Sequence, residues 1–448
     1  MIANDPLPPN TASLSPALHA GRYLVRRASC WLVALLCALV ACSEKSEESA
    51  PAPTRDDFVG VWRMVFDSPG GELPITVEIA SEPGSDRLRA EFRNGDQTLP
   101  FTEVSLAGRR INLRIEHRGA AITAELDHAR QRLVGTWQVI EQDGPATLPV
   151  VAYKGQTHRF ADPPAGMRGD AASVPSVAGT WKLVFKPDAS TSGIAELAQR
   201  GDVVTGIIIH PAGSLRYLTG QYKNGVLHLS SFNGGVASLV RARGREDGSL
   251  GGDIWFNDDG YLGFNGTRST PQAARASMRD PTTIVRVLDP TRPVAFHYPD
   301  LDGKLVSHDD PRFEGKVVLV ELFGSWCSNC NDAAPRLVEW YKRYRERGLE
   351  IVGLAYEHSG DAERDRRQVR LFAEHYGIEY PLLLAGTSDV SRPLEDLSEI
   401  HMYPTLLFVG KNGLVSKVHT GFLGPSAGVH FERQIAWMEA QIEALLDD

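Results

Sequence analysis

The stretch Trp326-Cys327-Ser328-Asn329-Cys330 places two cysteines three positions apart, between an apolar run and a segment with a helical pattern. The apolar run at 316–323 predicts a buried strand, and residues 333–347 predict a helix. This spacing at the start of a helix brings both sulfur atoms to one face, close enough to form a disulfide bond. The partial positive charge of a helix N-terminus favours a thiolate on Cys327. The stretch therefore predicts a dithiol that opens and closes a disulfide, as in thiol–disulfide oxidoreductases.

The same cysteine pair could instead be half of a zinc site. Such a site needs four ligands, which usually include a second Cys pair or a Cys/His pair at matching spacing. The other cysteines, Cys30, Cys37 and Cys42, lie in an N-terminal apolar segment, and no His pair at zinc-ligand spacing follows. The sequence thus favours redox chemistry by the cysteines themselves, with no metal and no other cofactor.

Length and composition limit the number of domains and the class of protein that can carry this dithiol. The chain has 448 residues, which is enough for two or three domains, and its 42% hydrophobic and 23% charged residues are ordinary for a globular protein. A net charge of −9 gives no sign of the basic face that nucleic-acid binding requires. With five cysteines in total, we expect no disulfide framework apart from the dithiol.

The N-terminus has the pattern of a bacterial lipoprotein signal. Arginines precede an apolar segment at 28–41, which is shorter than the roughly 20 residues of a membrane-spanning helix. The segment ends in Leu39-Val40-Ala41-Cys42, which resembles a lipobox. We therefore expect residues 1–41 to be a signal peptide and Cys42 to carry a lipid. An ordinary signal peptide or an uncleaved anchor is the alternative.

Residues 42–57 are rich in Ser, Glu, Pro and Ala and predict a flexible tether. A lipid anchor followed by a tether places the protein on the periplasmic side of a membrane, in an oxidising compartment where a partner must keep the dithiol reduced. Ser43 after the cysteine resembles an outer-membrane sorting signal of enterobacteria.

Residues 58–160 and 177–268 predict an all-β, antiparallel region. Short alternating runs recur between turn signals, among them Asn94-Gly95, Asn224-Gly225, Asp247-Gly248 and Asp259-Gly260. A Pro/Ala/Gly-rich linker at 161–176 separates the two parts, and a polar linker at 269–281 follows the second. The region shows no cluster of metal ligands, phosphate loop or catalytic triad, so we expect it to bind, position or space.

The two parts of the β region resemble each other. Trp62 and Trp181 open similar runs 119 positions apart, and Trp137 and Trp255 close similar runs 118 positions apart. These offsets predict a duplication, with roughly five or six strands in each unit. The units could close one barrel together, or form two small barrels or sandwiches.

From residue 282 to 448 strands and helices alternate, which predicts an α/β domain. A hairpin about Asp302-Gly303 precedes the strand at 316–323 and the Cys-x-x-Cys helix. A strand at 349–356, a helix at 362–376, a short strand at 381–385, a hairpin with strands at 405–409 and 414–419, and a helix at 428–446 follow.

This domain resembles the thioredoxin superfamily, specifically its TlpA/ResA-like extracytoplasmic branch. The resemblance covers about a third of the chain, and four features carry it. They are the hairpin before Gly315-Lys316-Val317, the Trp-Cys-x-x-Cys, the inserted strand and helix around Tyr376-Gly377, and Tyr403-Pro404-Thr405.

The resemblance implies a role for each matching residue. Cys327 is the nucleophile, exposed at the helix start, and Cys330 is the more buried resolving thiol. Trp326 shields the site, while Tyr403, Pro404 and Thr405 line the substrate groove, with Pro404 following a cis peptide bond. Glu321 matches the buried acid that takes the proton of the resolving cysteine, and burial in an apolar strand should raise its pKa. An alternative for Glu321 is a satisfied buried acid with a role in folding alone.

The leading hypothesis is a disulfide reductase or isomerase for proteins with disulfide bonds. By the resemblance, its electrons come from a membrane dithiol donor. A thiol peroxidase is a second hypothesis, but the Thr-x-x-Cys of peroxiredoxins is missing because Gly324 stands three residues before Cys327. A third is a surface-binding lipoprotein in which the β region carries the main function.

Overall fold

The computed structural model describes residues 53–448 except 96, 142–143, 165, 167, 188–191, 212, 389–393 and 401. The predicted signal peptide and Cys42 lie outside the described residues. The end of the predicted tether is a helical turn, α1 (Arg55–Phe58), so the tether prediction is wrong there. Asp57 accepts a hydrogen bond from the backbone N–H of Thr54 at 2.7 Å, and Phe58 is fully buried. This burial ties the turn to the first β unit.

The first β unit is a nine-stranded antiparallel sheet with the order β4-β3-β2-β1-β9-β8-β7-β6-β5. Its edges are therefore β4 and β5, and the sheet stays open between them. The strands are β1 (Gly60–Ser68), β2 (Gly71–Ser81), β3 (Leu88–Asn94), β4 (Gln97–Pro100), β5 (Glu103–Ala107), β6 (Arg110–Ile115), β7 (Ala120–Asp127), β8 (Arg132–Glu141) and β9 (Gly144–Lys154).

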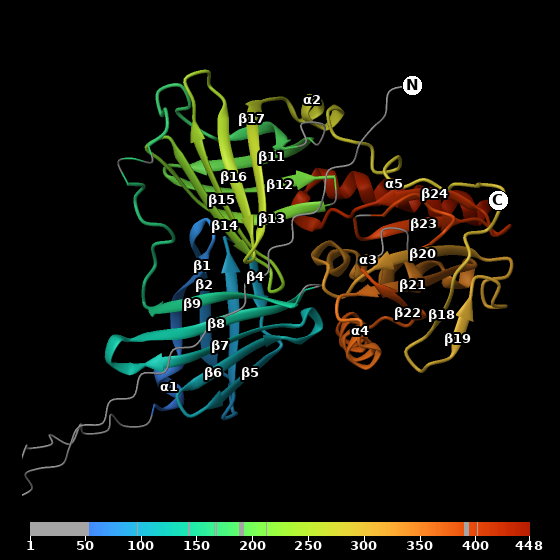
Figure 1. Cartoon of the computed structure of the whole chain (residues 1–448), viewed down its shortest axis with the longest axis horizontal. Coiled ribbons are helices and arrows are strands. Elements are labelled where there is room, and N and C mark those ends of the chain that lie inside the picture. The colour runs from blue at the N-terminus through green and yellow to red at the C-terminus, as the bar shows by residue number, and fades with distance from the viewer. Residues whose placement is uncertain are drawn as a thin grey trace, which may run out of the picture. The chain divides into compact units, whose positions relative to one another are not determined.

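The second unit is a closed antiparallel barrel in which each strand pairs with the next and β17 returns to β10 (Figure 1). The strands are β10 (Gly179–Lys186), β11 (Ser192–Arg200), β12 (Val203–His210), β13 (Gly213–Lys223), β14 (Val226–Phe232), β15 (Ala237–Gly244), β16 (Leu250–Phe256) and β17 (Gly260–Arg268). The prediction of roughly five or six strands per unit is therefore too low. The predicted turn Asn224-Gly225 joins β13 to β14, and both of its residues have positive φ.

The two units share details that support the predicted duplication. The indole Nε1 of Trp62 donates to the carbonyl of Phe58 at 2.8 Å, and that of Trp181 donates to Val177 at 2.8 Å. Both tryptophans are fully buried. The barrel has one long strand, β13, where the first unit has the short strands β4 and β5. This interruption leaves the first sheet open.

Described residues of both predicted linkers make defined contacts. Residues 271–276 of the second predicted linker form a short helix, α2 (Pro271–Ala276). The hydroxyl of Thr270 accepts a hydrogen bond from the N–H of Ala273, and Pro271 occupies the first helical turn, where proline is favourable. In the first linker, the N–H of Gly169 donates to the carbonyl of Asn224 at 3.0 Å, which ties it to the barrel.

The C-terminal domain has a five-stranded sheet with the order β22-β21-β20-β23-β24 (Figure 1). Its elements are the hairpin β18 (His297–Pro299) and β19 (Leu305–Ser307), then β20 (Val317–Phe323), α3 (Ser328–Tyr344), β21 (Leu349–Glu357), α4 (Ala362–Tyr376), β22 (Leu382–Thr387), β23 (Thr405–Val409), β24 (Val415–Thr420) and α5 (Val429–Asp447). β20 pairs in parallel with β21 and antiparallel with β23. The predicted fold class, an all-β region followed by a thioredoxin-like α/β domain, is confirmed. None of the helices in the described part of the chain is long and apolar enough to span a membrane.

Candidate active site

The dithiol lies where the central strand of the C-terminal sheet leads into α3. All seven residues of β20 are buried, and Cys327 caps the helix that starts at Ser328. Cys327 and Cys330 form a disulfide with their Cα atoms 5.2 Å apart. The backbone N–H of Cys330 donates to Sγ of Cys327 at 3.1 Å. A negative charge on this sulfur would therefore meet a hydrogen-bond donor and the positive end of α3.

The expectation that Cys327 is exposed is wrong: it is 5% exposed, and Cys330 is fully buried. The β region covers the start of α3. The side-chain amide of Asn233 donates to the hydroxyl of Ser328 at 2.9 Å, and the guanidinium of Arg216 donates to the carbonyl of Ser328 at 3.2 Å. Neither contact could be read from the thioredoxin resemblance, because that resemblance does not extend to the β region.

Arg216 links the barrel to the helix that carries the cysteines. Its side chain is 5% exposed and forms an ion pair with Asp332 of α3. Burial, and then the charge of Arg118, lowers the pKa of Arg216 to about 9. Because a buried charge whose partner is removed is costly, this pair should hold the two domains together.

A buried serine–glutamate pair fixes the turn before the cysteines. The N–H and the hydroxyl of Ser325 donate to the two carboxylate oxygens of Glu357, each at 2.7 Å. Burial raises the pKa of Glu357 to about 7, although the bonds from Ser325 oppose this shift. Sequence reasoning missed Glu357; its signal was an acid at the end of a buried strand next to β20.

Asn331, in the first turn of α3, holds the backbone around the cysteines. Its amide nitrogen donates to the carbonyls of Ser325 and Cys327, both at 2.9 Å. Its amide oxygen accepts a hydrogen bond from the hydroxyl of Tyr376 at 2.9 Å. This network joins α3 to the end of α4. Sequence reasoning did not single out Asn331.

Trp326 lies against the aromatic side chains that border the dithiol. Its indole donates to the carbonyl of Tyr356 at 2.9 Å, and its ring stacks on His358 with centroids 4.0 Å apart. Tyr403 meets it edge-on at 5.7 Å. This position fits the predicted shielding role, and His358 is a neighbour that sequence reasoning missed.

The predicted cis-proline loop reaches the same place. The bond between Tyr403 and Pro404 is cis, as predicted. Thr405 of β23 pairs with Leu322 of β20, and this brings the loop to the end of β20 that leads to the cysteines. Thr405 is fully buried and its hydroxyl donates to the carbonyl of Met402 at 3.0 Å, so its side chain supports the loop instead of lining an open groove.

Glu321 is a buried carboxyl with no hydrogen-bond partner for either oxygen among the described residues. It is 1% exposed and lies in β20 between Gly353 of β21 and Leu406 of β23. Burial raises its pKa to about 8. Burial and the charge of Glu321 together raise the pKa of Tyr380. An acid in this state can accept and release a proton near neutral pH.

The two sulfurs of the dithiol are bonded to each other in this structure. A separate group of carboxylates in the β region, Glu141, Asp258 and Asp259, has ligand atoms within 4.8 Å of one another. Two of the three are exposed. Exposed acids often gather without an ion, so we assign no metal to them.

We expect Arg216→Gln to make Cys327 more accessible after reduction. Loss of a charge-assisted bond costs about 1.5–3 kcal/mol, which should raise the open fraction, and hence the alkylation rate by iodoacetamide, by at least about tenfold. The control is Arg200→Gln, which removes the same charge from an exposed site on the barrel. Equal alkylation rates in the two variants would contradict a covering role for the barrel.

Comparisons with known proteins agree with this geometry. Residues 291–418 match the model of the AhpC/TSA family. The thiol-disulfide oxidoreductase ResA of Bacillus subtilis is 30% identical over 131 residues, covering 29% of this chain and 66% of the relative. ResA of Halalkalibacterium halodurans is 28% identical over 128 residues, with coverage of 29% and 66%. The chain thus spans just under two thirds of the length of these relatives.

Solved structures are also similar to the C-terminal part of the chain. One is a thiol:disulfide interchange protein of the thioredoxin family from Chlorobium tepidum, with 25% identity and a TM-score of 0.27. The likeness covers 35% of this chain and 97% of that protein. The family match, the ResA homologues and the sheet order lead to one conclusion: the C-terminal third of this chain is a thioredoxin-like domain of the AhpC/TSA family.

Proposed function

We propose that this chain is an extracytoplasmic thiol–disulfide oxidoreductase that reduces disulfide bonds in proteins. The observation that carries the proposal is the Cys327–Cys330 disulfide at the start of α3, beside the loop of cis Pro404. Relatives named thiol-disulfide oxidoreductase support it. We further propose that a lipid on Cys42 anchors the protein to a membrane, and that its domains span 58–160, 177–268 and 282–448.

The proposed reaction starts from the reduced dithiol. The thiolate of Cys327 attacks one sulfur of a substrate disulfide; a mixed disulfide forms and the other substrate sulfur leaves as a thiolate. Cys330 then loses its proton and attacks Sγ of Cys327, which releases the second substrate thiolate. The substrate gains two electrons, and the enzyme is left with the Cys327–Cys330 disulfide. A dithiol donor at the membrane would reduce it again by the same exchange.

Glu321 is the group that we propose for the proton of Cys330. Its carboxyl is buried in the strand that leads to the dithiol and has a pKa of about 8, so it is partly ionised near neutral pH. A proton accepted from Cys330 in the resolving step can be returned when the disulfide is reduced. Trp326, Tyr403 and Pro404 would shape the surface where the substrate disulfide meets Cys327.

The reduction potential of the Cys327–Cys330 couple tests the proposed direction. We expect a value below roughly −220 mV, in the range of reductases that need an electron supply, and well below the roughly −120 mV of a strong oxidant. Equilibration with glutathione or dithiothreitol buffers, followed by thiol alkylation, measures it. The double variant Cys327→Ser/Cys330→Ser is the control and should show no couple. A potential near −120 mV would contradict a reductase.

The binding-lipoprotein and thiol-peroxidase hypotheses predict different results from the proposed reductase. The contacts of the β region with Ser328 support a role in controlling access to the dithiol. A binding lipoprotein would keep its cellular phenotype after both cysteines are replaced, whereas the proposed reductase would lose it. A thiol peroxidase would consume hydrogen peroxide at the expense of a thiol reductant, and we expect no such turnover because Gly324 replaces the threonine of the peroxidatic motif.

A further inference from the structure

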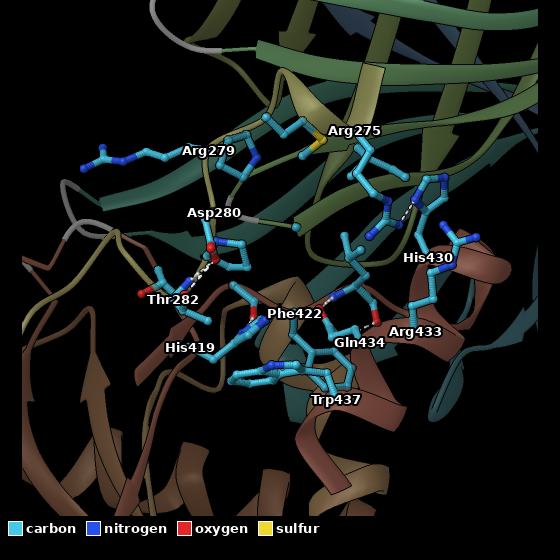
Figure 2. A pocket seen from close by; sticks show the side chains of 18 of the residues that line it. Arg275, Arg279, Asp280, Thr282, His419, Phe422, His430, Arg433, Gln434 and Trp437 are labelled. Atoms are coloured by element: carbon cyan, nitrogen blue, oxygen red, sulfur yellow. Dashed lines mark hydrogen bonds between the residues drawn. The ribbon is translucent and has the colours of Figure 1, made fainter. Parts of the chain in front are cut away.

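A cavity of about 610 Å³ lies between the closed barrel and the C-terminal domain (Figure 2). Its walls come from the turn between β12 and β13, from α2 and the segment that follows it, and from β24 and α5. It is therefore built by three parts of the chain that are far apart in sequence. None of the side chains that line this cavity has a role in the proposed oxidoreductase reaction.

The charge of the cavity is opposite to that of the chain. The whole sequence has 56 acidic and 47 basic residues, whereas the cavity is lined by four permanent cations and one carboxylate, that of Asp280. The cations are Arg275, Arg279, Lys417 and Arg433. Asp280 is already engaged, because it accepts bonds from the N–H and the hydroxyl of Thr282 at 2.9 and 2.8 Å. The ion pairs found among the described residues include none of the four cations.

Two of these cations come from different elements and lie beside the same histidine. Arg275 comes from α2 and Arg433 from α5, and Figure 2 shows both beside His430. Burial, and then the charge of Arg433, lowers the pKa of Arg275. The guanidinium of Arg275 is hydrogen-bonded to Nδ1 of His430, and Nε2 of the same ring is hydrogen-bonded to the carboxylate of Glu196 at 2.8 Å. His430 therefore holds Arg275 in place. Two guanidinium groups that border the same histidine create a site that an anion would stabilise.

The opposite side of the cavity is aromatic. Phe422 is fully buried, and the rings of His419 and Trp437 lie with centroids 5.4 Å apart. Burial lowers the pKa of His419 to about 4, so this ring is neutral near pH 7. The cavity thus offers charge on one side and an apolar surface on the other, a combination typical of small-molecule sites.

The cavity also adjoins both loops that hold the dithiol. The N–H of Gly421, in its lining, donates to the carbonyl of Pro404 at 2.7 Å. The lining includes Gly213, and the N–H of the next residue, Ser214, donates to the side chain of Asn329 at 3.4 Å. A molecule in the cavity would therefore touch Gly421, which is hydrogen-bonded to the cis-proline loop, and Gly213, whose neighbour Ser214 is hydrogen-bonded to the Cys-x-x-Cys turn.

We propose that this cavity binds a phosphate-type oxyanion carried on a molecule with an apolar part. Arg275 and Arg433 would bind the oxyanion, since planar guanidinium groups donate paired hydrogen bonds to such groups. Trp437, which is partly exposed, would contact the apolar part. The same chemistry occurs in a soluble phosphate compound and in a phospholipid headgroup.

Calorimetric titration of the full chain tests the proposal with two probes: inorganic pyrophosphate and a water-soluble short-chain phosphatidylglycerol. We expect Arg433→Gln, at an exposed position that should not disturb folding, to weaken binding at least about tenfold, and Arg275→Gln to do the same. The matched control is Arg89→Gln, an exposed arginine of β3, which should bind like the unaltered chain.

The outcomes separate the two sources of the oxyanion. Binding of pyrophosphate that is lost in Arg433→Gln supports the site and a soluble ligand. Binding of the lipid alone, lost in the same variant, supports the site and a headgroup. The proposal is overturned if neither probe binds, or if Arg433→Gln and Arg89→Gln bind equally well. Each result stands apart from the proposed function, because the titration measures binding on oxidised protein and does not depend on turnover.

Discussion

Cys330→Ser is expected to trap the protein in a mixed disulfide with its substrate, and Cys327→Ser is expected to abolish reduction. Without Cys327 there is no thiolate at the start of α3 to attack a disulfide, so turnover should fall on the order of a thousandfold or more. Without Cys330 the attack still occurs, but no second thiolate releases the product. Reduction of insulin measures turnover, and a gel run without reductant shows the trapped adduct.

The matched control is Cys37→Ser, which makes the same substitution in the predicted signal peptide and should leave turnover unchanged. Because Cys327 and Cys330 are both buried, thermal unfolding of each variant must first show an intact fold. Substantial insulin reduction by folded Cys327→Ser would refute the assignment of the nucleophile. Failure of Cys330→Ser to form an adduct would refute the resolving role.

Local pattern was enough to predict the C-terminal domain from sequence. The apolar run of β20, the helix after it and the hairpin of β23 and β24 are each specified by residues close together in the chain. Tyr403-Pro404 could be recognised for the same reason, and its cis bond is present. The burial of Glu321 followed from its place inside an apolar strand. These predictions needed no knowledge of which distant segments meet.

Predictions failed where distant segments meet. The cover over the dithiol joins Arg216 and Asn233 of the barrel to Ser328, and the separations are 112 and 95 residues. No periodicity within one element encodes such a contact. Glu357 was missed in the same way, because its partner Ser325 lies 32 residues away.

Glu321→Gln is expected to remove a large part of the pH dependence of stability. The pKa of Glu321 in the folded chain is about 8, against an ordinary value of 4.5, so the folded state binds this proton more tightly than the unfolded state does. The stabilisation is complete below pH 4.5 and is lost as pH rises through 8. A shift of this size corresponds to roughly 5 kcal/mol. The amide of Gln has no charge to bury, so the variant should avoid this loss.

Urea unfolding of oxidised protein at pH 4 and pH 9 checks the sign, since Cys327 and Cys330 do not titrate while they form a disulfide. The two proteins should have similar free energies of unfolding at pH 4, and the variant should be the more stable at pH 9. Glu363→Gln, at an exposed carboxyl of α4, is the matched control and should follow the unaltered chain.

If Glu321 also takes the proton of Cys330, the gain in stability must come with a loss of rate. Turnover by Glu321→Gln at pH 7 should then fall about a hundredfold, with the resolving step slowed and the mixed disulfide accumulating. Higher stability at pH 9 with unchanged turnover would leave Glu321 a buried acid without a role in proton transfer.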